Sequence, residues 1–509
     1  MLEGSSFVNS RMNSEVVTFF DTTLRDGEQT PNVSLTDEQK LTIAKALDKL
    51  GVDVIEAGFP ISSKGEYNAV RSIVNADLRT TICGLARVVK PDIDACLDAG
   101  VGLVHVFAST SDVQLKHSMK KTRQEVYDLS VDAVEYVKEH GTQSLFSAMD
   151  ATRTEPEFLY RICRGMESAG ADIINIPDTV GIMAPSKMFD FIKRIKGVVK
   201  VPIDVHCHND FGLAVANSLS AIEAGANQVQ VTVNGIGERA GNADLAQTAM
   251  GLSSIFGAKL NINTQFLLET SRLVERFTKI NIPPTMPIVG ENAFSHESGI
   301  HSRGVIERAD TFEPGIMTPE MVGQRRRLVA GKHAGKHAVR EMLKDALFDV
   351  TEDELVRILD RVKEIGDQGR RVTDVDLYVI AEAITNEVLK PTILLEELSV
   401  MTGNRITPTA TVKAVVEGKT KIGARIGIGP VDAAINAVHD ILGGTDVQLR
   451  TFRIDAISGG TDALADVVIG VEDSRGNMVT ARAARGDIVI ASVEAMISAI
   501  NRLKARDGA

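Results

Sequence analysis

Residues 203–233, IDVHCHNDFGLAVANSLSAIEAGANQVQVTV, contain two short runs suited to strands, separated by an amphipathic stretch. The runs Ile203–His206 and Gln228–Val233 predict strands, and Ala214–Ala224 between them predicts a helix. A strand, a helix and a second strand in this order form a parallel βαβ unit, because the helix returns the chain to the start of the next strand. The fold of the first half of the chain is built from this unit.

The same alternation extends from Val16 to about Ala258. Eight such units in about 240 residues predict a (β/α)8 TIM barrel. An open doubly wound sheet is the alternative, but it usually has fewer units. It also often carries a Gly-rich phosphate turn after its first strand, which this sequence lacks. The predicted strands are Val16–Phe20, Val52–Glu56, Thr80–Leu85, Leu103–Phe107, Leu145–Ala148, Ile173–Ile176, Ile203–His206 and Gln228–Val233.

Beyond the barrel, residues 259–390 predict helices, with a Pro-rich break at residues 282–284 and a second helical stretch from Lys336 to Val388. Pro391 then opens a strand-rich region. There, residues 410–442 and 464–503 each predict two strands followed by a helix, which indicates an internal duplication within a small α+β domain. Chance similarity between short amphipathic elements is the alternative. The expected division is a disordered leader at 1–14, a barrel catalytic domain at 15–280, helical linker subdomains at 281–390 and a C-terminal domain at 391–509.

The composition limits the class of protein. The 509 residues are 44% hydrophobic and 24% charged, which is normal for a folded protein of two or three domains. No apolar run approaches the about 20 residues of a membrane-spanning helix. The four cysteines show no CxxC spacing, and the net charge of −12 argues against nucleic-acid binding. We therefore expect a cytoplasmic enzyme without a membrane or nucleic-acid partner.

Three polar clusters follow predicted strands, at the end of the barrel where TIM-barrel chemistry occurs. They are residues 21–29 (DTTLRDGEQ), 206–210 (HCHND) and 234–242 (NGIGERAGN). His206 and His208 are two residues apart in a strand, so they face the same side. The first, seventh and eighth strands are neighbours once a barrel closes, so the three clusters meet.

Asp26 and Asn242 can therefore flank His206 and His208 at the barrel mouth. A carboxylate, two imidazoles and an amide oxygen form a mixed N/O site that leaves positions for water or substrate. Such a site suits a divalent metal ion (Mn, Zn or Mg) acting as a Lewis acid. A histidine pair alone would more simply be hydrogen-bonded in the core. The four residues together favour a metal site.

The same three segments resemble the signatures of the 2-isopropylmalate, citramalate and homocitrate synthase family, and the resemblance extends from Thr18 to the C-terminus. It implies that Asp26, His206, His208 and Asn242 hold the metal. It also implies that Arg25 polarises the keto group of a 2-oxo acid and stabilises the developing alkoxide.

Two further roles follow from the resemblance. Thr179, in residues 177–181 (PDTVG), resembles the residue that hydrogen-bonds the keto-acid carboxylate. His301, in residues 296–301 (HESGIH), matches the base that removes a proton from the methyl group of acetyl-CoA. A helix-capping or surface histidine is the alternative for His301. The implied reaction is a Claisen-type condensation of acetyl-CoA with a 2-oxo acid, followed by thioester hydrolysis.

The acceptor is expected to be 2-oxoisovalerate, which would place the chain at the first committed step of leucine biosynthesis. Residues 56–63 (EAGFPISS) and His105, as a substrate-binding residue, resemble the isopropylmalate branch. Ordinary barrel packing for Phe59 and a hydrogen-bonded core position for His105 are the alternatives. The second hypothesis is an (R)-citramalate synthase that uses pyruvate, and the third is a homocitrate synthase.

Two other classes are disfavoured. Related lyases of 3-hydroxy-3-methylglutaryl-CoA place a cysteine in a Gly-rich loop, and no cysteine here lies in one. A non-catalytic amino-acid sensor would not need the metal residues. Two positions depart from the family pattern, since many relatives carry a glutamate at Met149 and a tyrosine at Phe312. These departures leave the metal residues and Arg25 intact.

The C-terminal region resembles a regulatory domain that binds the end-product amino acid and dimerises. This implies a homodimer with leucine as feedback inhibitor. Its recognisable stretches are residues 427–433 (GIGPVDA) and 458–463 (SGGTDA), where free N–H groups before a helix could receive a carboxylate. Ordinary loop turns are the alternative. The candidate regulatory residues are Gly429, Asp432, Gly460 and Asp462.

Overall fold

A computed structural model describes most of the chain as two compact units, one built from residues 16–295 and 313–326 and the other mainly from residues 327–507. Among the described residues, no helix combines the length and apolar character needed to cross a bilayer. The described residues are 16–298, 304–305, 308, 311, 313–346, 348–368, 372–385, 392–443, 447–456 and 465–507.

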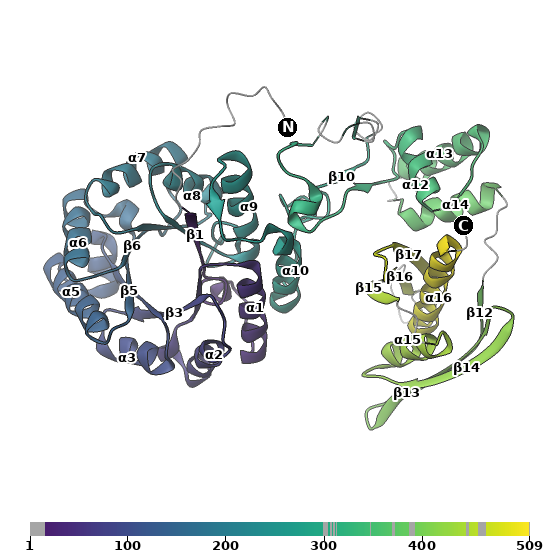
Figure 1. Ribbon diagram of the computed structural model, residues 1–509, viewed down its shortest axis with the longest axis horizontal. Helices are drawn as coiled ribbons and strands as arrows, with labels where there is room; N and C mark the ends of the chain where they lie inside the picture. Colours follow the sequence, from purple (N-terminus) through teal and green to yellow (C-terminus); the bar gives the residue numbers. More distant parts are fainter. Residues whose placement is uncertain are drawn as a thin grey trace. The chain divides into compact units, whose positions relative to one another are not determined.

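Eight parallel strands close into a barrel in the first unit, ringed by helices (Figure 1). Closure is direct, because β1 pairs with both β2 and β8. The short strand β9 (Lys259–Leu260) extends the sheet beside β1. The predicted TIM barrel is confirmed. Its strands are β1 (Val16–Asp21), β2 (Val54–Gly58), β3 (Thr81–Arg87), β4 (Leu103–Ser109), β5 (Gln143–Met149), β6 (Ile173–Asp178), β7 (Ile203–Cys207) and β8 (Gln228–Val231).

Local sequence explains where the outer helices begin and which faces they bury. Helix α1 starts at a capping box in which Thr36 and Gln39 bond each other's backbone N–H, and it buries Ile43, Leu47 and Leu50 on one face. The helices after it repeat this stripe against the strands. These helices are α2 (Lys64–Val74), α3 (Lys90–Ala99), α5 (Arg123–Glu139), α6 (Pro156–Ser168), α7 (Pro185–Lys196), α8 (Ala214–Glu223), α9 (Leu245–Met250) and α10 (Leu267–Thr278). Helix α1 itself spans Asp37–Leu50, and the short α4 (Asp112–Gln114) buries no side chain.

The barrel interior changes from apolar to polar along the strands. A separate small core contains Val54, Leu103 and Leu145, together with Phe20 and Cys83. Because residues two apart share a face of a strand, the next inward positions on β2, β4 and β5 are polar. The interior thus becomes hydrophilic towards the carboxyl ends of the strands, where the three motif loops lie. These inward polar residues are Glu56, His105 and Ser147.

The prediction of helices in 259–390 is confirmed for α10 and for the stretch from Lys336, but the interruption between them is longer than the expected break at residues 282–284. Between α10 and α12, the described residues form loops, a 3-10 helix at Pro319–Val322 and the two-residue strands β10 (Ser295–His296) and β11 (Arg327–Leu328). This stretch is rich in proline and glycine, which interrupt the hydrogen bonds and raise the entropic cost of a helix. Helices resume with α12 (Lys336–Asp345), α13 (Glu352–Asp367) and α14 (Asp374–Thr385).

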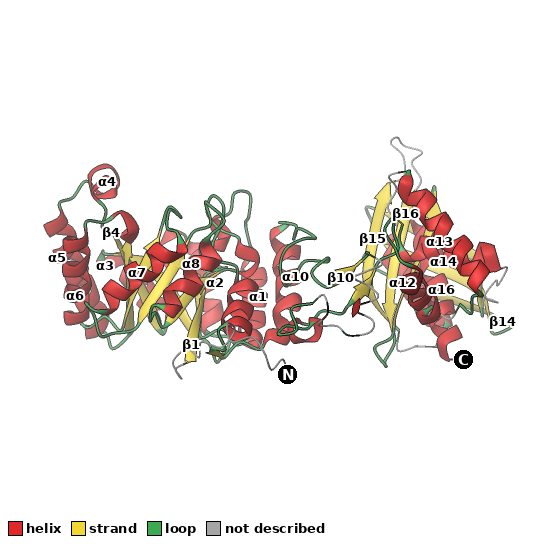
Figure 2. Cartoon of the chain, turned by 90° about the horizontal axis from the view of Figure 1, so that it is seen from above, coloured by secondary structure: helices red, strands yellow, loops and turns green. Residues whose placement is uncertain are grey.

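The C-terminal module, which we define as β12 to α16, repeats one unit twice, but each unit has three strands and not two. Each antiparallel sheet is followed by a helix, and α16 lies along its own sheet (Figure 2). The first strand of the first unit was missed because β12 exposes most of its side chains, which weakens its apolar alternation. The elements are β12 (Ile393–Gly403), β13 (Ile406–Val416), β14 (Lys419–Ile426), α15 (Pro430–Ile441), β15 (Gln448–Ala456), β16 (Ala465–Glu472), β17 (Met478–Arg485) and α16 (Ile488–Asp507).

Candidate active site

Asp26, His206 and His208 meet at the mouth of the barrel. All three are buried, and one ligand atom from each lies within 4.8 Å of the others. His206 and His208 come from the end of β7 and just beyond it, and Asp26 from the loop after β1. Barrel closure brings these segments together across about 180 residues of sequence, as the motif spacing predicts.

The ring orientation of His206 is fixed by two residues that sequence reasoning did not single out. The Nε2 group of Gln230 donates to Oδ2 of Asp204 at 2.6 Å, so Oε1 of Gln230 faces Nδ1 of His206 at 2.8 Å. His206 must therefore carry its proton on Nδ1, which leaves the Nε2 lone pair for a metal. The available signal was the alternation of polar residues in two strands that are otherwise apolar.

Asn242 joins this group from the loop after β8. Its Nδ2 group donates to Oδ1 of Asp26 at 2.8 Å, and its backbone forms an isolated bridge with His208. Gly237 makes room for both side chains, because a Cβ there would lie 2.1 Å from Nδ2 of Asn242 and its φ is +157°. The four residues predicted as metal ligands therefore lie side by side.

The donor set fits a divalent cation. Two nitrogens bound to one ion at about 2.0–2.1 Å are about 3 Å apart in neighbouring positions. The Nε2 atoms of His206 and His208 are 3.1 Å apart. Oδ1 of Asn242 is buried and has no hydrogen-bond partner among the described residues, which leaves it available as a ligand. These residues provide a candidate divalent-metal site.

The ionisation states also suit metal binding. Burial, followed by repulsion from His208, lowers the pKa of His206 to about 3, so its imidazole is neutral at neutral pH. Burial also lowers the pKa of His208. Burial opposes ionisation of Asp26, but Arg25 and the two histidines together hold the pKa of Asp26 well below its usual range. Two neutral imidazoles and one carboxylate are the forms that bind metal ions.

Arg25 is held beside the candidate metal ligands by two carboxylates. Its Nη1 group donates to Oδ2 of Asp26 at 2.7 Å, and its Nε group donates to Oε2 of Glu56 at 2.6 Å. Burial works against the charge on Glu56, but Arg25 and His105 lower the pKa of Glu56 to about 2. Arg25 is thus a fixed cation next to the ligands, with the Nη2 group free of any hydrogen bond among the described residues.

His105 extends this chain below Arg25. One ring nitrogen lies 2.6 Å from Oε1 of Glu56, and the other lies 2.6 Å from Oγ of Ser147. The ring is only 3% exposed, and both of its nitrogens are engaged by the protein. Glu56 and Ser147 were not predicted as site residues. Their signal in the sequence was a polar residue at an inward position of an apolar strand.

Thr179 lies in the loop after β6, on the same rim as the metal ligands. Its Oγ1 accepts a hydrogen bond from the backbone N–H of Asp150 at 2.9 Å. Because that N–H occupies one lone pair, the hydroxyl hydrogen of Thr179 can be donated elsewhere. Asp150 is buried in a left-handed conformation (φ 67°) and is held by Arg153, so the donor is itself fixed. Thr179 is therefore oriented as a hydrogen-bond donor at the rim.

The remaining predicted residues belong to the second unit or lie outside the described residues. Gly429 and Asp432 lie at the start of α15, where the backbone N–H of Ile428 donates to Oδ2 of Asp432 at 2.9 Å. That contact caps the local turn. Four positions discussed from the sequence lie outside the described residues: His301, Phe312, Gly460 and Asp462.

The cysteines have ordinary surroundings, and so does a basic run formed by residues 324–327 (QRRR) with Lys332, which could otherwise meet the phosphates of CoA. All four cysteines are buried and free, and burial raises the pKa of Cys207, between the two histidines, to about 12. Such a thiol stays protonated and is a poor nucleophile. In the basic run, Arg326 pairs with Glu313 at 2.6 Å, and Lys332 pairs with Asp367 at 2.9 Å. These pairs favour a solvated, ion-paired surface over a phosphate site.

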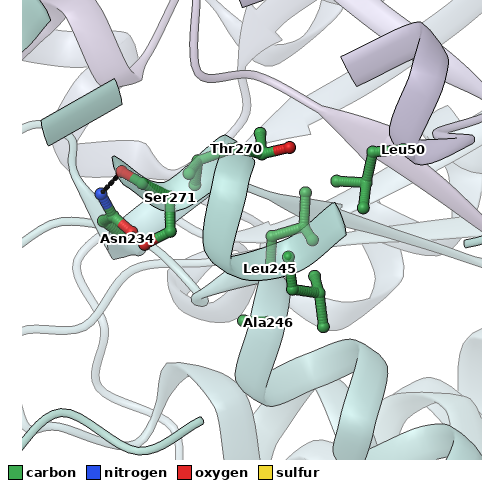
Figure 3. Close-up of a pocket in the computed structure, with 8 residues that line it drawn as sticks. Leu50, Asn234, Leu245, Ala246, Thr270 and Ser271 are labelled. Carbon is green, nitrogen blue, oxygen red and sulfur yellow. Dashed lines mark hydrogen bonds between the residues drawn. The ribbon is translucent and has the colours of Figure 1, made fainter. Parts of the chain in front are cut away.

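A small cavity lies behind the turn after β8, between α1, α9 and α10 (Figure 3). Its volume is about 10 Å³, room for at most one water molecule. Ser271 and Asn234 are hydrogen-bonded at its edge, which ties α10 to the turn. It is a packing defect and not a substrate site. It is lined by Leu50, Val233, Asn234, Leu245, Ala246, Leu267, Thr270 and Ser271.

Comparison with known proteins gives the family. The HMGL-like family model matches residues 16–274, which is the barrel with all the proposed metal ligands. The chain belongs to the HMGL-like family. Outside the barrel, a homocitrate synthase post-HMGL domain-like model matches residues 288–370, and a LeuA allosteric (dimerisation) domain model matches residues 371–504.

Curated relatives align along nearly the whole chain. A probable 2-isopropylmalate synthase of Methanosarcina mazei is 61% identical over 504 residues, covering 98% of each chain. The 2-isopropylmalate synthase of Methanocaldococcus jannaschii is 52% identical over 496 residues, covering 96% of this chain and 95% of the relative. An (R)-citramalate synthase of the same organism is 46% identical over 491 residues, covering 96% and 99%. Among these three relatives, the identity is greater to the isopropylmalate synthases.

Proposed function

We propose that this chain is a 2-isopropylmalate synthase, which condenses acetyl-CoA with 2-oxoisovalerate (3-methyl-2-oxobutanoate) and hydrolyses the thioester. The observation that carries the proposal is the 52–61% identity, along nearly the full length, to proteins with that name. The metal triad and the adjacent Arg25 support the chemistry. This is the acyltransferase reaction of the first committed step of leucine biosynthesis.

In this proposal, Asp26, His206, His208 and Asn242 hold a divalent ion (Mn, Zn or Mg), which supplies a Lewis acid at the keto group. The Nη2 group of Arg25 faces the developing alkoxide, and Glu56 and Asp26 keep the guanidinium from turning away. We propose that His105 supports binding of the 2-oxo acid through Glu56, since both of its ring nitrogens are engaged.

The remaining steps are assigned to Thr179 and His301. The hydroxyl of Thr179 donates to the carboxylate of the 2-oxo acid. His301 removes a proton from the acetyl methyl group, and the new C–C bond forms at the keto carbon. The keto oxygen takes a proton, and water cleaves the thioester to release CoA and the product acid. A buried site is required, because an exposed enolate would be quenched by solvent.

The test is release of the free thiol of CoA with Mn²⁺ and one of three acceptors: 2-oxoisovalerate, pyruvate or 2-oxoglutarate. Selective turnover of 2-oxoisovalerate is expected. Preference for pyruvate would make the chain an (R)-citramalate synthase, the second candidate, which relatives of 45–48% identity represent. Absence of turnover with all three acceptors would refute the proposal. It would also favour the sensor reading if the protein still bound leucine.

For the second unit we propose feedback regulation by leucine and a homodimer joined through the C-terminal module. The match to the LeuA allosteric (dimerisation) domain supports both. We keep residues 15–280, 281–390 and 391–509 as the proposed domain division, and the cytoplasm as the proposed location. Adding leucine to the thiol assay tests the regulation, and sedimentation tests the dimer. Inhibition by leucine in a protein that sediments as a monomer would show that regulation does not require the dimer.

A further inference from the structure

Arg239 links three loops at the barrel mouth. Its Nε and Nη2 groups donate to the two carboxylate oxygens of Asp210, each at 2.7 Å, and Nη2 also donates to the backbone carbonyl of Thr179 at 2.8 Å. Arg239 belongs to the loop after β8, Asp210 to the loop after β7, and Thr179 to the loop after β6. A bidentate Arg–carboxylate pair fixes direction as well as distance.

The backbone around this side chain is constrained for the contact. Arg239 has φ 56°, a left-handed conformation that costs energy for a residue with a Cβ. Gly181, two residues after Thr179, packs so closely that a Cβ would lie 2.6 Å from Oδ2 of Asp210 and 2.9 Å from the carbonyl oxygen of His208. The three loops are therefore fitted to one another around the guanidinium.

The metal ligands do not depend on Arg239 for their position. The loops after β7 and β8 are joined independently, by the bridge between His208 and Asn242 and by the hydrogen bond from the N–H of Asn209 to the carbonyl of Gly241 at 2.9 Å. The carbonyl of Thr179, by contrast, has Arg239 as its only hydrogen-bond donor among the described residues. Loss of Arg239 should thus disturb Thr179 and spare the metal site.

We propose that Arg239 is a positioning residue for the 2-oxo acid: it holds the Thr179 peptide so that the Thr179 hydroxyl points at the substrate carboxylate. This inference rests on the proposed function, because it needs an acceptor whose carboxylate lies at the rim. The hydroxyl oxygen of Thr179 is already turned by the N–H of Asp150. Arg239 fixes the other side of the same residue, so the direction of its free O–H is defined from both ends.

The test compares R239K, T179V and the double variant in the thiol-release assay. Lysine keeps the charge but cannot make the forked contact to Asp210 and the bond to Thr179 together. For R239K we expect the KM for 2-oxoisovalerate to rise roughly tenfold, the size of one lost charge-assisted hydrogen bond. The KM for acetyl-CoA and the affinity for Mn²⁺, measured by direct titration, should stay within about twofold of the wild type.

The double variant shows whether Arg239 acts through Thr179. In the T179V background, R239K should add no further rise in the KM for 2-oxoisovalerate. The matched control is R272K, because Arg272 makes an exposed pair with Glu275 within α10 and joins no loops. D210N should reproduce a smaller rise, since it weakens the fork from the other side.

Several outcomes would overturn the proposal: an unchanged KM for 2-oxoisovalerate in R239K, an equal rise for acetyl-CoA, a loss of Mn²⁺ affinity, or multiplied effects in the double variant. If the wild type turns over no acceptor, titration of 2-oxoisovalerate into Mn²⁺-loaded wild type and R239K decides. Binding of 2-oxoisovalerate by the wild type together with weaker binding by R239K supports the positioning role. Absence of binding by the wild type refutes it together with the proposed function.

Discussion

The barrel and the C-terminal module both bury a large apolar core, but they differ in how deeply their charged side chains are buried. The barrel buries Asp26, Lys40, Glu56 and both metal-site histidines, each paired with other polar groups. Among the described residues of the module, no charged residue is fully buried, although the Arg502 side chain is only 15% exposed, and apolar side chains such as Ile422 and Ile428 are exposed. Buried charges need partners in fixed positions, whereas exposed apolar surface needs something to cover it.

This difference fits a catalytic role for the barrel and a role in dimerisation for the module. Charges held away from water act strongly on one another and on a reacting group, so the barrel mouth is built for catalysis. The module offers no such site among its described residues, but its sheets present apolar faces, as a domain for dimerisation requires. Four experiments test this division.

The largest effect is expected from H208A. Removing one imidazole ligand should lower the kcat/KM for condensation by about three orders of magnitude, because a bound divalent ion supplies several kcal/mol of charge stabilisation. The measurement is thiol release together with Mn²⁺ titration. The matched variant H439A, on α15 of the module, should stay within about twofold of the wild type without leucine. Equal losses in the two variants would contradict the division.

The second experiment compares two lysines. Lys40 is 2% exposed and pairs with Glu28 and Glu66, each at 2.6 Å, whereas Lys504 makes a surface pair with Glu417 in the module. K40M leaves two carboxylates without their cation and should cost about 3–5 kcal/mol of stability. K504M should cost about 0–1 kcal/mol. Calorimetric unfolding of both variants measures the difference, and similar costs would show that burial of charge does not distinguish the units.

The third experiment weakens the module without touching the barrel. Ile469 is fully buried in β16, so I469A should destabilise the module by about 2–5 kcal/mol. Condensation without leucine should remain at the wild-type rate, while inhibition by leucine weakens. Ile422 supplies the comparison, because it is exposed within one chain: I422A should cost the monomer about 0.5 kcal/mol or less, and a larger cost would indicate that a partner copy covers it. A loss of basal turnover in I469A would mean that the barrel depends on the module.

The smallest effect concerns Glu56 and pH. Its pKa in the folded protein is about 2, below the ordinary value of 4.5, so its ionised form stabilises the fold above pH 4.5. That contribution is lost as the pH falls towards 2. The stability difference between the wild type and E56Q should therefore shrink by about 2 kcal/mol between pH 4.5 and about pH 3. Denaturant titrations at several pH values measure it, and a difference that does not change with pH would exclude this role.

Much of the barrel could be read from sequence because its signals are local. Strand periodicity, helix caps and the spacing of His206 and His208 each depend on a few adjacent residues. The helices and strands of the linker and the module are harder to predict from the sequence. The break between α10 and α12 is longer than the one expected at residues 282–284, and β12 exposes too many side chains to show a clear alternation. Where burial is weak, the pattern that marks an element is weak as well.

Local sequence patterns are sufficient to predict the barrel, its strand order and the residue types that could bind a metal. Which polar groups are in contact becomes evident only in the folded chain: Gln230 faces His206, Glu56 lies between Arg25 and His105, and Arg239 reaches the Thr179 carbonyl. These contacts join residues that are distant in sequence, and their geometry depends on closure of the barrel. A local pattern can place a side chain on one face of a strand, but the partner it meets depends on how the whole sheet curves.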